Sequence, residues 1–358
     1  MAQQKKKRGW FSRLTFGSVS LGLAGLLLLS YASLLVNPAR AWFFTIFGLL
    51  FFPLLITTAL FFLWAVLRRS RTAFLLALML LPALLLFGRY YQFRGPDPDQ
   101  TPEPTLKVVS YNVGRFVHAD ADIPILALAD SVAAYLRGQD ADVICLQEFY
   151  LPLSQDLAPW LRRHFPGYQA EYYALTGKKG RFGNVTLSRL PIVSKGKLTF
   201  DKSTNMAFYT DIRLHKSTLR FYNCHFESYN ISIPALLKRI GKEEDVMEDT
   251  GRRMRRSITQ RPQQVETVMR DIDACPVRSM VLGDFNDTPV SYTYQRLRRG
   301  HSDAFVKAGK GFGATYRLFL PLLRIDYMLY PKDLEAVSYQ TGPVRYSDHY
   351  PVIATYTE

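Results

Sequence analysis

Apolar runs in the C-terminal two thirds of the chain repeatedly end on side chains that can bind a metal ion or transfer a proton. Val108 to Tyr111 and Asp142 to Leu146 are two such runs. The polar residues found at the ends of these runs are Asn112, Glu148, His225, Asp284, Asn286, Asp326, Asp348 and His349. Carboxylates seldom lie next to a core without a partner or a metal, because removing an unpaired charge from water is costly. We therefore expect metal-assisted or acid–base chemistry at these positions.

Each of these residues, taken alone, has an ordinary structural explanation. Asn112 can cap a turn, and an isolated Asp-x-Asn such as Asp284 to Asn286 is usually an Asx turn. Glu148 can pair with an arginine, and a strand histidine such as His225 is usually satisfied by a neighbour. An isolated Asp-His pair such as Asp348 and His349 usually lies in a surface loop. The recurrence of such sites at the ends of apolar runs favours a functional site.

The elements that must position these residues are short β-branched runs alternating with longer helical patterns. Strands are expected at 106–113, 142–148, 184–187, 206–214, 218–226, 279–284, 325–330 and 351–357. Helices are expected at 123–137, about 154–164, 256–273 and 291–299. Strands 206–214 and 218–226 are joined by a loop too short for a helical crossover, so the sheets must be partly antiparallel.

The ordered set of motifs resembles the endonuclease/exonuclease/phosphatase superfamily, the deoxyribonuclease I-like metal-dependent phosphoesterases. The matching segments are Ser110–Asn112, Leu146–Glu148, Gly183–Ile192, Asn223–Phe226, Gly283–Asp287, Arg324–Tyr327 and Ser347–Pro351. The resemblance covers essentially all of 105–358 and none of 1–94. It implies an α/β (α+β) fold, a four-layered α/β/β/α sandwich of two mixed β-sheets, with the active site where the strand ends converge.

The resemblance also implies a metal site and a base. Glu148, with Asn112 beside it, would hold a divalent cation, and carboxylate and amide oxygens suit Mg²⁺ or Mn²⁺ better than zinc. Asp284, helped by Asn286, would orient and deprotonate the attacking water. Some family members carry a second acid at the position of Gly114, which makes a single-metal site the simpler expectation.

The remaining polar residues are expected at the phosphate. His225 and His349 would donate hydrogen bonds to its non-bridging oxygens, with Asp348 orienting the His349 ring. Asp326 would support either the metal or a histidine. The reaction implied is in-line attack of water on phosphorus, with no covalent intermediate.

The first 94 residues have the composition of a membrane anchor. They contain 11 Lys and Arg and no Asp or Glu, whereas residues 95–358 carry 34 Lys and Arg against 30 acids, a net charge of +4. Uncharged apolar stretches of 26, 27 and 17 residues predict transmembrane helices at about 14–36, 41–67 and 72–88. The basic start also resembles a cleavable signal peptide, but the further apolar segments favour a retained anchor. The third stretch is short enough to be re-entrant instead.

The basic residues near the spans predict the orientation. Five Lys and Arg precede the first span, one lies in the first loop, three in the second and two after the third. By the positive-inside rule the N-terminus is cytoplasmic, and three crossings put the catalytic domain, 105–358, outside the cytoplasm, in the periplasm if the membrane is a bacterial inner membrane. If the third segment does not cross, that domain stays in the cytoplasm. The Pro- and acid-rich linker 95–104 is expected to be an extended spacer that holds the domain off the bilayer.

The leading hypothesis is therefore a membrane-tethered, metal-dependent phosphoesterase, and the rival is a non-catalytic binding module on the same scaffold. The sequence leaves the substrate open between nucleic acid and a phospholipid or sphingolipid headgroup. A basic cluster favours nucleic acid, although acids precede it closely; it consists of Arg252, Arg253, Arg255, Arg256 and Arg261. The apolar segment 229–240 could contact anionic lipid or pack into the core. The sequence identifies no protein partner.

Overall fold

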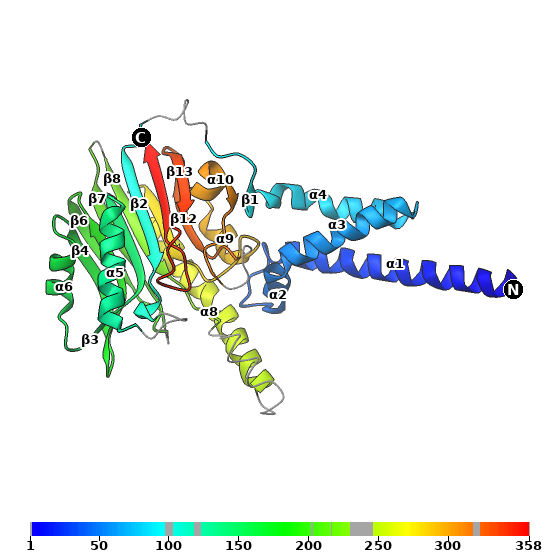
Figure 1. The fold of residues 1–358 in the computed structure, drawn as a ribbon, viewed down its shortest axis with the longest axis horizontal. Helices are drawn as coiled ribbons and strands as arrows, with labels where there is room; N and C mark the ends of the chain where they lie inside the picture. Colours follow the sequence, from blue (N-terminus) through cyan, green and yellow to red (C-terminus); the bar gives the residue numbers. More distant parts are fainter. Residues whose placement is uncertain are drawn as a thin grey trace.

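The computed structural model describes residues 2–96, 103–117, 123–201, 203–215, 217–229, 246–317 and 323–357. Most of the linker and of the apolar segment 229–240 therefore lies outside the described residues. Two parts are in contact: four N-terminal helices, called here the helical segment, and a layered body of sheets and helices, called here the sandwich (Figure 1).

The helical segment consists of α1 (Ala2–Ala32), α2 (Phe43–Leu49), α3 (Phe51–Leu67) and α4 (Thr72–Phe87). The expectation of one continuous helix over 41–67 is wrong, because α2 and α3 are bent by 64° at their junction. Pro53 explains the break: its ring would clash with the carbonyl of Leu49, the last residue of α2, if a single helix continued.

Fewer helices than the three predicted are long and apolar enough to cross a bilayer. Among the described residues, Leu14–Ala32 is long and apolar enough to cross a bilayer, and α2 with α3 would be a second span if the bent pair counts as one. A signal sequence near an N-terminus has the same length and apolar composition. α4 has 16 residues and is shorter than a span requires.

Two six-stranded sheets form the centre of the sandwich. The first has the order β13 (Glu335–Thr341), β14 (Val352–Thr357), β2 (Leu106–Asn112), β3 (Val143–Pro152), β5 (Gly180–Ser188), β4 (Gln169–Thr176). The second has the order β10 (His301–Asp303), β12 (Asp326–Pro331), β9 (Ser279–Asp284), β8 (Thr218–His225), β7 (Met206–Arg213), β6 (Ile192–Leu198). Only the pairs β2–β3 and β8–β9 within these sheets are parallel, so both sheets are mixed, as expected.

The layers follow from side chains that alternate along the strands. Val108 of β2 packs between the sheets against residues such as Phe221, whereas Val109 packs outward against α5 (Ile125–Gly138). α6 (Leu157–His164) lies on the same outer face, and α8 (Val246–Ala274) with α9 (Tyr292–Leu297) covers the other sheet. The predicted four-layered sandwich is confirmed, and α8 begins earlier than the predicted helix.

A buried polar bridge joins the two sheets close to the strand ends. The Asn223 amide of β8 donates to the carbonyls of Leu146 at 3.2 Å and Val185 at 3.0 Å, and its oxygen accepts from Gln147 at 2.9 Å. Buried polar groups specify an arrangement when they are paired, as the amide nitrogen and oxygen of Asn223 are. The bridge therefore fixes the position of one sheet's strand ends against the other's.

The helical segment packs directly against the sandwich, contrary to the spacing expected from the linker. β1 (Tyr91–Gln92) pairs with β11 (Gly311–Phe312), a strand that follows the short helix α10 (Ala304–Ala308). Arg89 donates to the carbonyl of Pro289 at 2.9 Å. Residues 89–92, which precede the linker, therefore already contact the sandwich.

Candidate active site

Two β-α-β units place polar residues at one edge of the sandwich. In the first, β2 ends at Asn112 and Glu148 follows in β3; in the second, β8 ends at His225 and β9 at Asp284. The strands of each unit are parallel, and His225 lies directly opposite Asp284 in the register. Carboxyl ends of neighbouring parallel strands share an edge, so these side chains meet there.

Two antiparallel strands begin at the same edge. Asp326, the first residue of β12, lies opposite Asp284 in the register of β12 and β9. His349 precedes β14, whose first residue, Val352, pairs with Ser110 near the end of β2. Antiparallel strands therefore add an acid and a histidine to the four residues supplied by the parallel pairs.

The backbone around the site adopts conformations that are uncommon for most residues. Glu148 has φ of 50° beside a register shift in β3, and Asn286 has φ of 53°. A bulge of this kind re-aims a side chain, and non-glycine residues with positive φ concentrate at functional sites. Gly283 has φ of 121°, and a Cβ there would lie 2.1 Å from the carbonyl oxygen of Cys224, so only glycine fits.

Asp284 lies at the centre of the cluster and is almost fully buried. Its Oδ2 accepts from Asn112 Nδ2 at 2.9 Å and lies 3.8 Å from the Nε2 atoms of both His225 and His349. Asn286 donates from its backbone to Asp284 Oδ1 at 2.9 Å and from its amide to Oδ2 at 3.0 Å. Four of the other seven predicted residues are thus brought together around this carboxylate.

Glu148 joins the cluster from the other sheet. Its Oε1 lies 3.4 Å from His225 Nε2 and accepts from Asn112 Nδ2 at 3.4 Å. Its Oε2 accepts from Arg115 Nε at 3.1 Å. Sequence reasoning missed Arg115, whose only signal was its place three residues after Asn112.

Asp326 takes one of its two expected places, whereas Asp348 differs from its expected place. His349 Nδ1 lies 2.9 Å from Asp326 Oδ2, so Asp326 supports this histidine. The expected contact between Asp348 and the ring is not observed, because Asp348 Oδ1 accepts from Ser347 Oγ at 3.1 Å. Tyr316, which no sequence pattern indicated, packs edge-on against the His349 ring at 4.9 Å.

Burial and neighbouring charges shift the pKa values of the site. Burial raises the pKa of Asp284 to about 6, with the Asp326 carboxylate adding to the effect. Burial would lower the pKa of His349, but Asp326 and Asp284 outweigh it and raise that pKa to about 10. Burial would raise the pKa of Glu148, yet His225 and Arg115 hold it below its usual value.

The donor set fits a hard divalent cation. Asp284, Asp326 and His349 are buried, and one ligand atom from each lies within 4.8 Å of the others. Glu148 adds a carboxylate at the same edge, and oxygen donors of this kind suit Mg²⁺ or Mn²⁺. His225 Nε2 is buried and makes no hydrogen bond among the described residues, although Glu148 Oε1 lies 3.4 Å from it, so it is available to a group bound at this edge.

The basic cluster on α8 is largely engaged within the protein. Arg261 is buried, donates to the carbonyl of Glu227 and pairs with Asp287 Oδ2 at 3.0 Å. Arg252 and Arg253 pair with acids of the same helix. Arg261 therefore belongs to the interior and is no part of a nucleic-acid surface.

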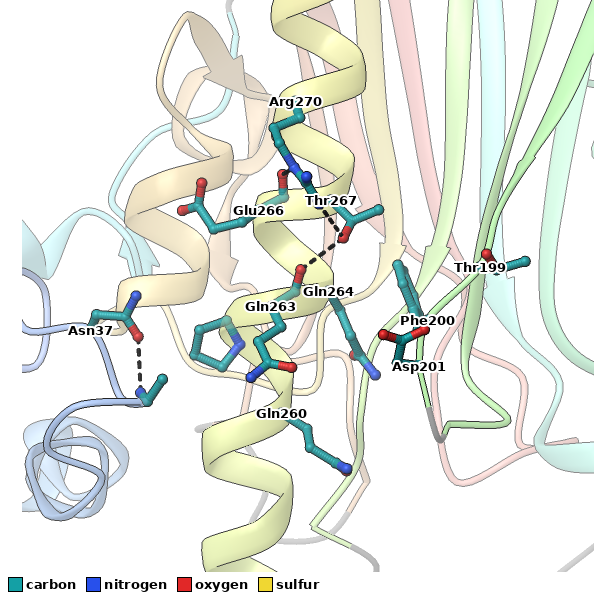
Figure 2. A pocket seen from close by; sticks show the side chains of 12 residues that line it. Asn37, Thr199, Phe200, Asp201, Gln260, Gln263, Gln264, Glu266, Thr267 and Arg270 are labelled. Carbon is teal, nitrogen blue, oxygen red and sulfur yellow. Dashed lines mark hydrogen bonds between the residues drawn. The ribbon is translucent and has the colours of Figure 1, made fainter.

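A pocket of about 470 Å³ lies away from these residues. Figure 2 shows its lining residues on α8, on the segment that follows β6 and on the loop after α1, with Asn37 on one side of α8 and Thr199 and Asp201 on the other. Its lining is polar and shares no residue with the Asp284 cluster. The candidate chemistry therefore belongs to the strand edge and not to this pocket.

Two family models match the chain. One, described as the Endonuclease/Exonuclease/phosphatase family, matches residues 109–349. The other, described as Domain of unknown function (DUF8431), matches residues 12–90. No curated protein matches significantly.

Solved structures share the fold at low sequence identity. An endonuclease/exonuclease/phosphatase from Beutenbergia cavernae DSM 12333 is 18% identical with a TM-score of 0.53, over 71% of this chain and 72% of that chain. An endonuclease/exonuclease/phosphatase family protein from Leptotrichia buccalis C-1013-b is 16% identical with a TM-score of 0.52, over 71% of this chain and 100% of that chain. D. rerio TDP2 complexed with single strand DNA product is 16% identical with a TM-score of 0.51, over 71% of this chain and 99% of that chain.

Proposed function

Because the chain belongs to the endonuclease/exonuclease/phosphatase family, whose members hydrolyse phosphoester bonds, we propose that it is a membrane-tethered, divalent-metal-dependent phosphodiesterase. The observation that carries the proposal is the set of contacts around Asp284. Asn112, His225 and His349 reach this one carboxylate from three different strands or strand ends. A structural ion pair would need one partner, whereas here three side chains converge on one carboxylate, and within the described part of the chain His225 Nε2 makes no hydrogen bond.

The contacts support a role for each of these residues. A divalent cation, Mg²⁺ or Mn²⁺, would offset negative charge on the phosphate; Glu148, with Asn112 beside it, would hold it. Asp284, held by Asn286, would orient water and take its proton. His225 and the protonated His349 would donate to phosphate oxygens, where charge builds up as the P–O bond breaks.

The proposed roles predict loss of activity without loss of fold. Asp284→Ala or His349→Ala should lower kcat on a generic phosphodiester such as bis(p-nitrophenyl) phosphate by at least about 100-fold. His164→Ala is a matched control, because His164 lies on α6 and pairs with Asp130, outside the cluster. Activity retained in both site variants, at unchanged circular dichroism, would refute the assignment. A protein that binds phosphodiesters but never turns them over would instead be the binding module.

Two substrate classes follow from different observations. The DNA product held by D. rerio TDP2, a protein of similar fold, favours nucleic acid. The direct packing of an apolar helical segment on the sandwich favours a substrate presented at a bilayer, a phospholipid or sphingolipid headgroup. Plasmid DNA, phosphatidylinositol vesicles and sphingomyelin vesicles should be compared with Mg²⁺ present. Nicking that collapses with rising salt would identify a nuclease, and turnover on vesicles alone would identify a lipid phosphodiesterase.

A further inference from the structure

The segment 284–291 begins at the last residue of β9, carries two site residues and is buried along its whole length. Here it is called the Asp284 loop. The sandwich holds it on one side, where Tyr327 donates to the carbonyl of Asp287 at 2.8 Å and Arg261 pairs with the Asp287 side chain. Its other side faces the helical segment.

Three residues of the helical segment bond to successive residues of the Asp284 loop. Ser33 Oγ lies 2.9 Å from the carbonyl of Val290 and 2.6 Å from that of Ser30, so its single proton is shared between the two. Arg89 Nη1 donates to the carbonyl of Pro289 at 2.9 Å. Thr288 Oγ1 donates to the carbonyl of Gly48 at 3.3 Å. Backbone carbonyls buried in this way need a donor, so the helices satisfy groups that the sandwich leaves open.

Apolar packing reinforces these bonds. Val290 is fully buried in a cluster whose other buried members come from the helical segment; they are Leu27, Phe51, Phe52, Leu55, Ala83, Leu86 and Tyr90. Gly48 lies so close that a Cβ there would be 2.5 Å from the carbonyl oxygen of Val290. The helices therefore pack onto the backbone of the loop itself.

A second site strand is tied to the helices. Arg324, two residues before Asp326, donates from Nε to the carbonyl of Arg89 at 3.1 Å. The same guanidinium is buried in an ion pair with Asp303 at 2.8 Å. The helical segment thus contacts the backbone of the Asp284 loop and, near Asp326, the side chain of Arg324.

We infer that the helical segment is a positioning element of the active site, in which Ser33, Gly48 and Arg89 hold the Asp284 loop in its active geometry. This inference rests on the proposed function of Asp284. It makes turnover depend on the packing of the helices and not only on their presence as a tether. A displacement of about 1 Å in such a group can cost about 100-fold in rate.

Glycine substitutions in the full-length protein test the inference. Gly48→Ala places a methyl group against both Ser33 Oγ and the Val290 carbonyl, whereas Gly22→Ala, in α1, meets nothing within 4 Å. Gly48→Ala should lower kcat at least about tenfold with KM unchanged, because the loop orients water and does not hold substrate. It should also speed hydrogen exchange of amides 284–291, and Gly22→Ala should change neither quantity.

The exchange measurement separates the inference from the proposed function. If the parent protein hydrolyses no phosphodiester, the proposed function is refuted. Hydrogen exchange of amides 284–291 would still show whether the helical segment stabilises the loop. Equal exchange and equal kcat in Gly48→Ala and Gly22→Ala would overturn the inference. If Gly48→Ala does not fold, Ser33→Ala and Arg89→Met remove a donor without adding bulk, and Arg89→Lys should restore part of kcat. Parental exchange and turnover in both donor variants would likewise overturn it.

Discussion

At the scale of single residues, the His349 ring lies between two acids. Its Nδ1 contacts Asp326 at 2.9 Å, which leaves Nε2 directed towards Asp284 at 3.8 Å. A carboxylate on one ring nitrogen sets the tautomer and orientation of the ring, and so determines where the other nitrogen can donate. The position of Asp326 thus matters to the chemistry although it need not touch the substrate.

This contact predicts unequal effects for the two acids near His349. Asp326→Asn should lower kcat by about 10- to 100-fold, because an amide cannot hold the ring as a carboxylate does. Asp348→Asn should cost much less, since Asp348 contacts Ser347 and not the ring. Steady-state kinetics on both variants, with melting temperatures as a check on folding, makes the comparison. A larger loss of kcat in Asp348→Asn than in Asp326→Asn would show that Asp348, and not Asp326, orients the ring.

At the scale of elements, each β-α-β unit supplies part of the site and its helix holds the strand ends in place. α8 shows this through Arg261, which reaches the segment after β8 at Glu227 and the segment after β9 at Asp287. Both partners of the Arg261–Asp287 pair are buried. Removing one partner of a buried pair leaves the other charge uncompensated.

Arg261→Ala should therefore lower the free energy of unfolding by about 3 to 5 kcal/mol. Arg252→Ala on the same helix is the matched control, because Arg252 is 66% exposed and pairs with Glu248 in solvent. An exposed pair of this kind is worth about 0 to 1 kcal/mol. Urea unfolding followed by tryptophan fluorescence measures both. Equal losses would show that the buried pair contributes no more than a surface pair.

At the scale of the whole molecule, the short helix α4 decides on which side of a membrane the sandwich would lie. The basic residues predict a cytoplasmic N-terminus, and an odd number of crossings puts the sandwich on the other side. α4 has 16 residues, about 24 Å of helix, against a hydrocarbon core of about 30 Å. Local thinning of the bilayer or a tilt of neighbouring helices would have to accommodate the difference.

Reporter fusions after Arg71 and after Arg94 test this topology. We expect the reporters on opposite sides of the membrane, with the fusion after Arg94 outside the cytoplasm. Paired reporters, one active only in the cytoplasm and one only outside it, give the side directly. Signals on the same side at both points would contradict the three-span topology and leave the sandwich in the cytoplasm.

The sequence determined the central strands and the residues at their ends. β2 and β9 are buried on both faces and read as continuous apolar runs, so their ends are visible without a structure. β4 and β6 were missed because they are edge strands with partly exposed, mixed side chains. The local pattern therefore sufficed where burial was complete and failed where it was partial.

Only the tertiary structure decided which residues touch. Asp326, not Asp348, faces His349 because β12 pairs with β9 in a register that puts Asp326 opposite Asp284. Ser33 meets Val290 across 257 positions of sequence, a contact that no local periodicity encodes. Periodicity reports whether a residue is buried, whereas its partner depends on strand register and on the packing of distant elements. The chemistry could therefore be expected from the sequence, whereas the packing of the helical segment on the Asp284 loop could not be predicted from it.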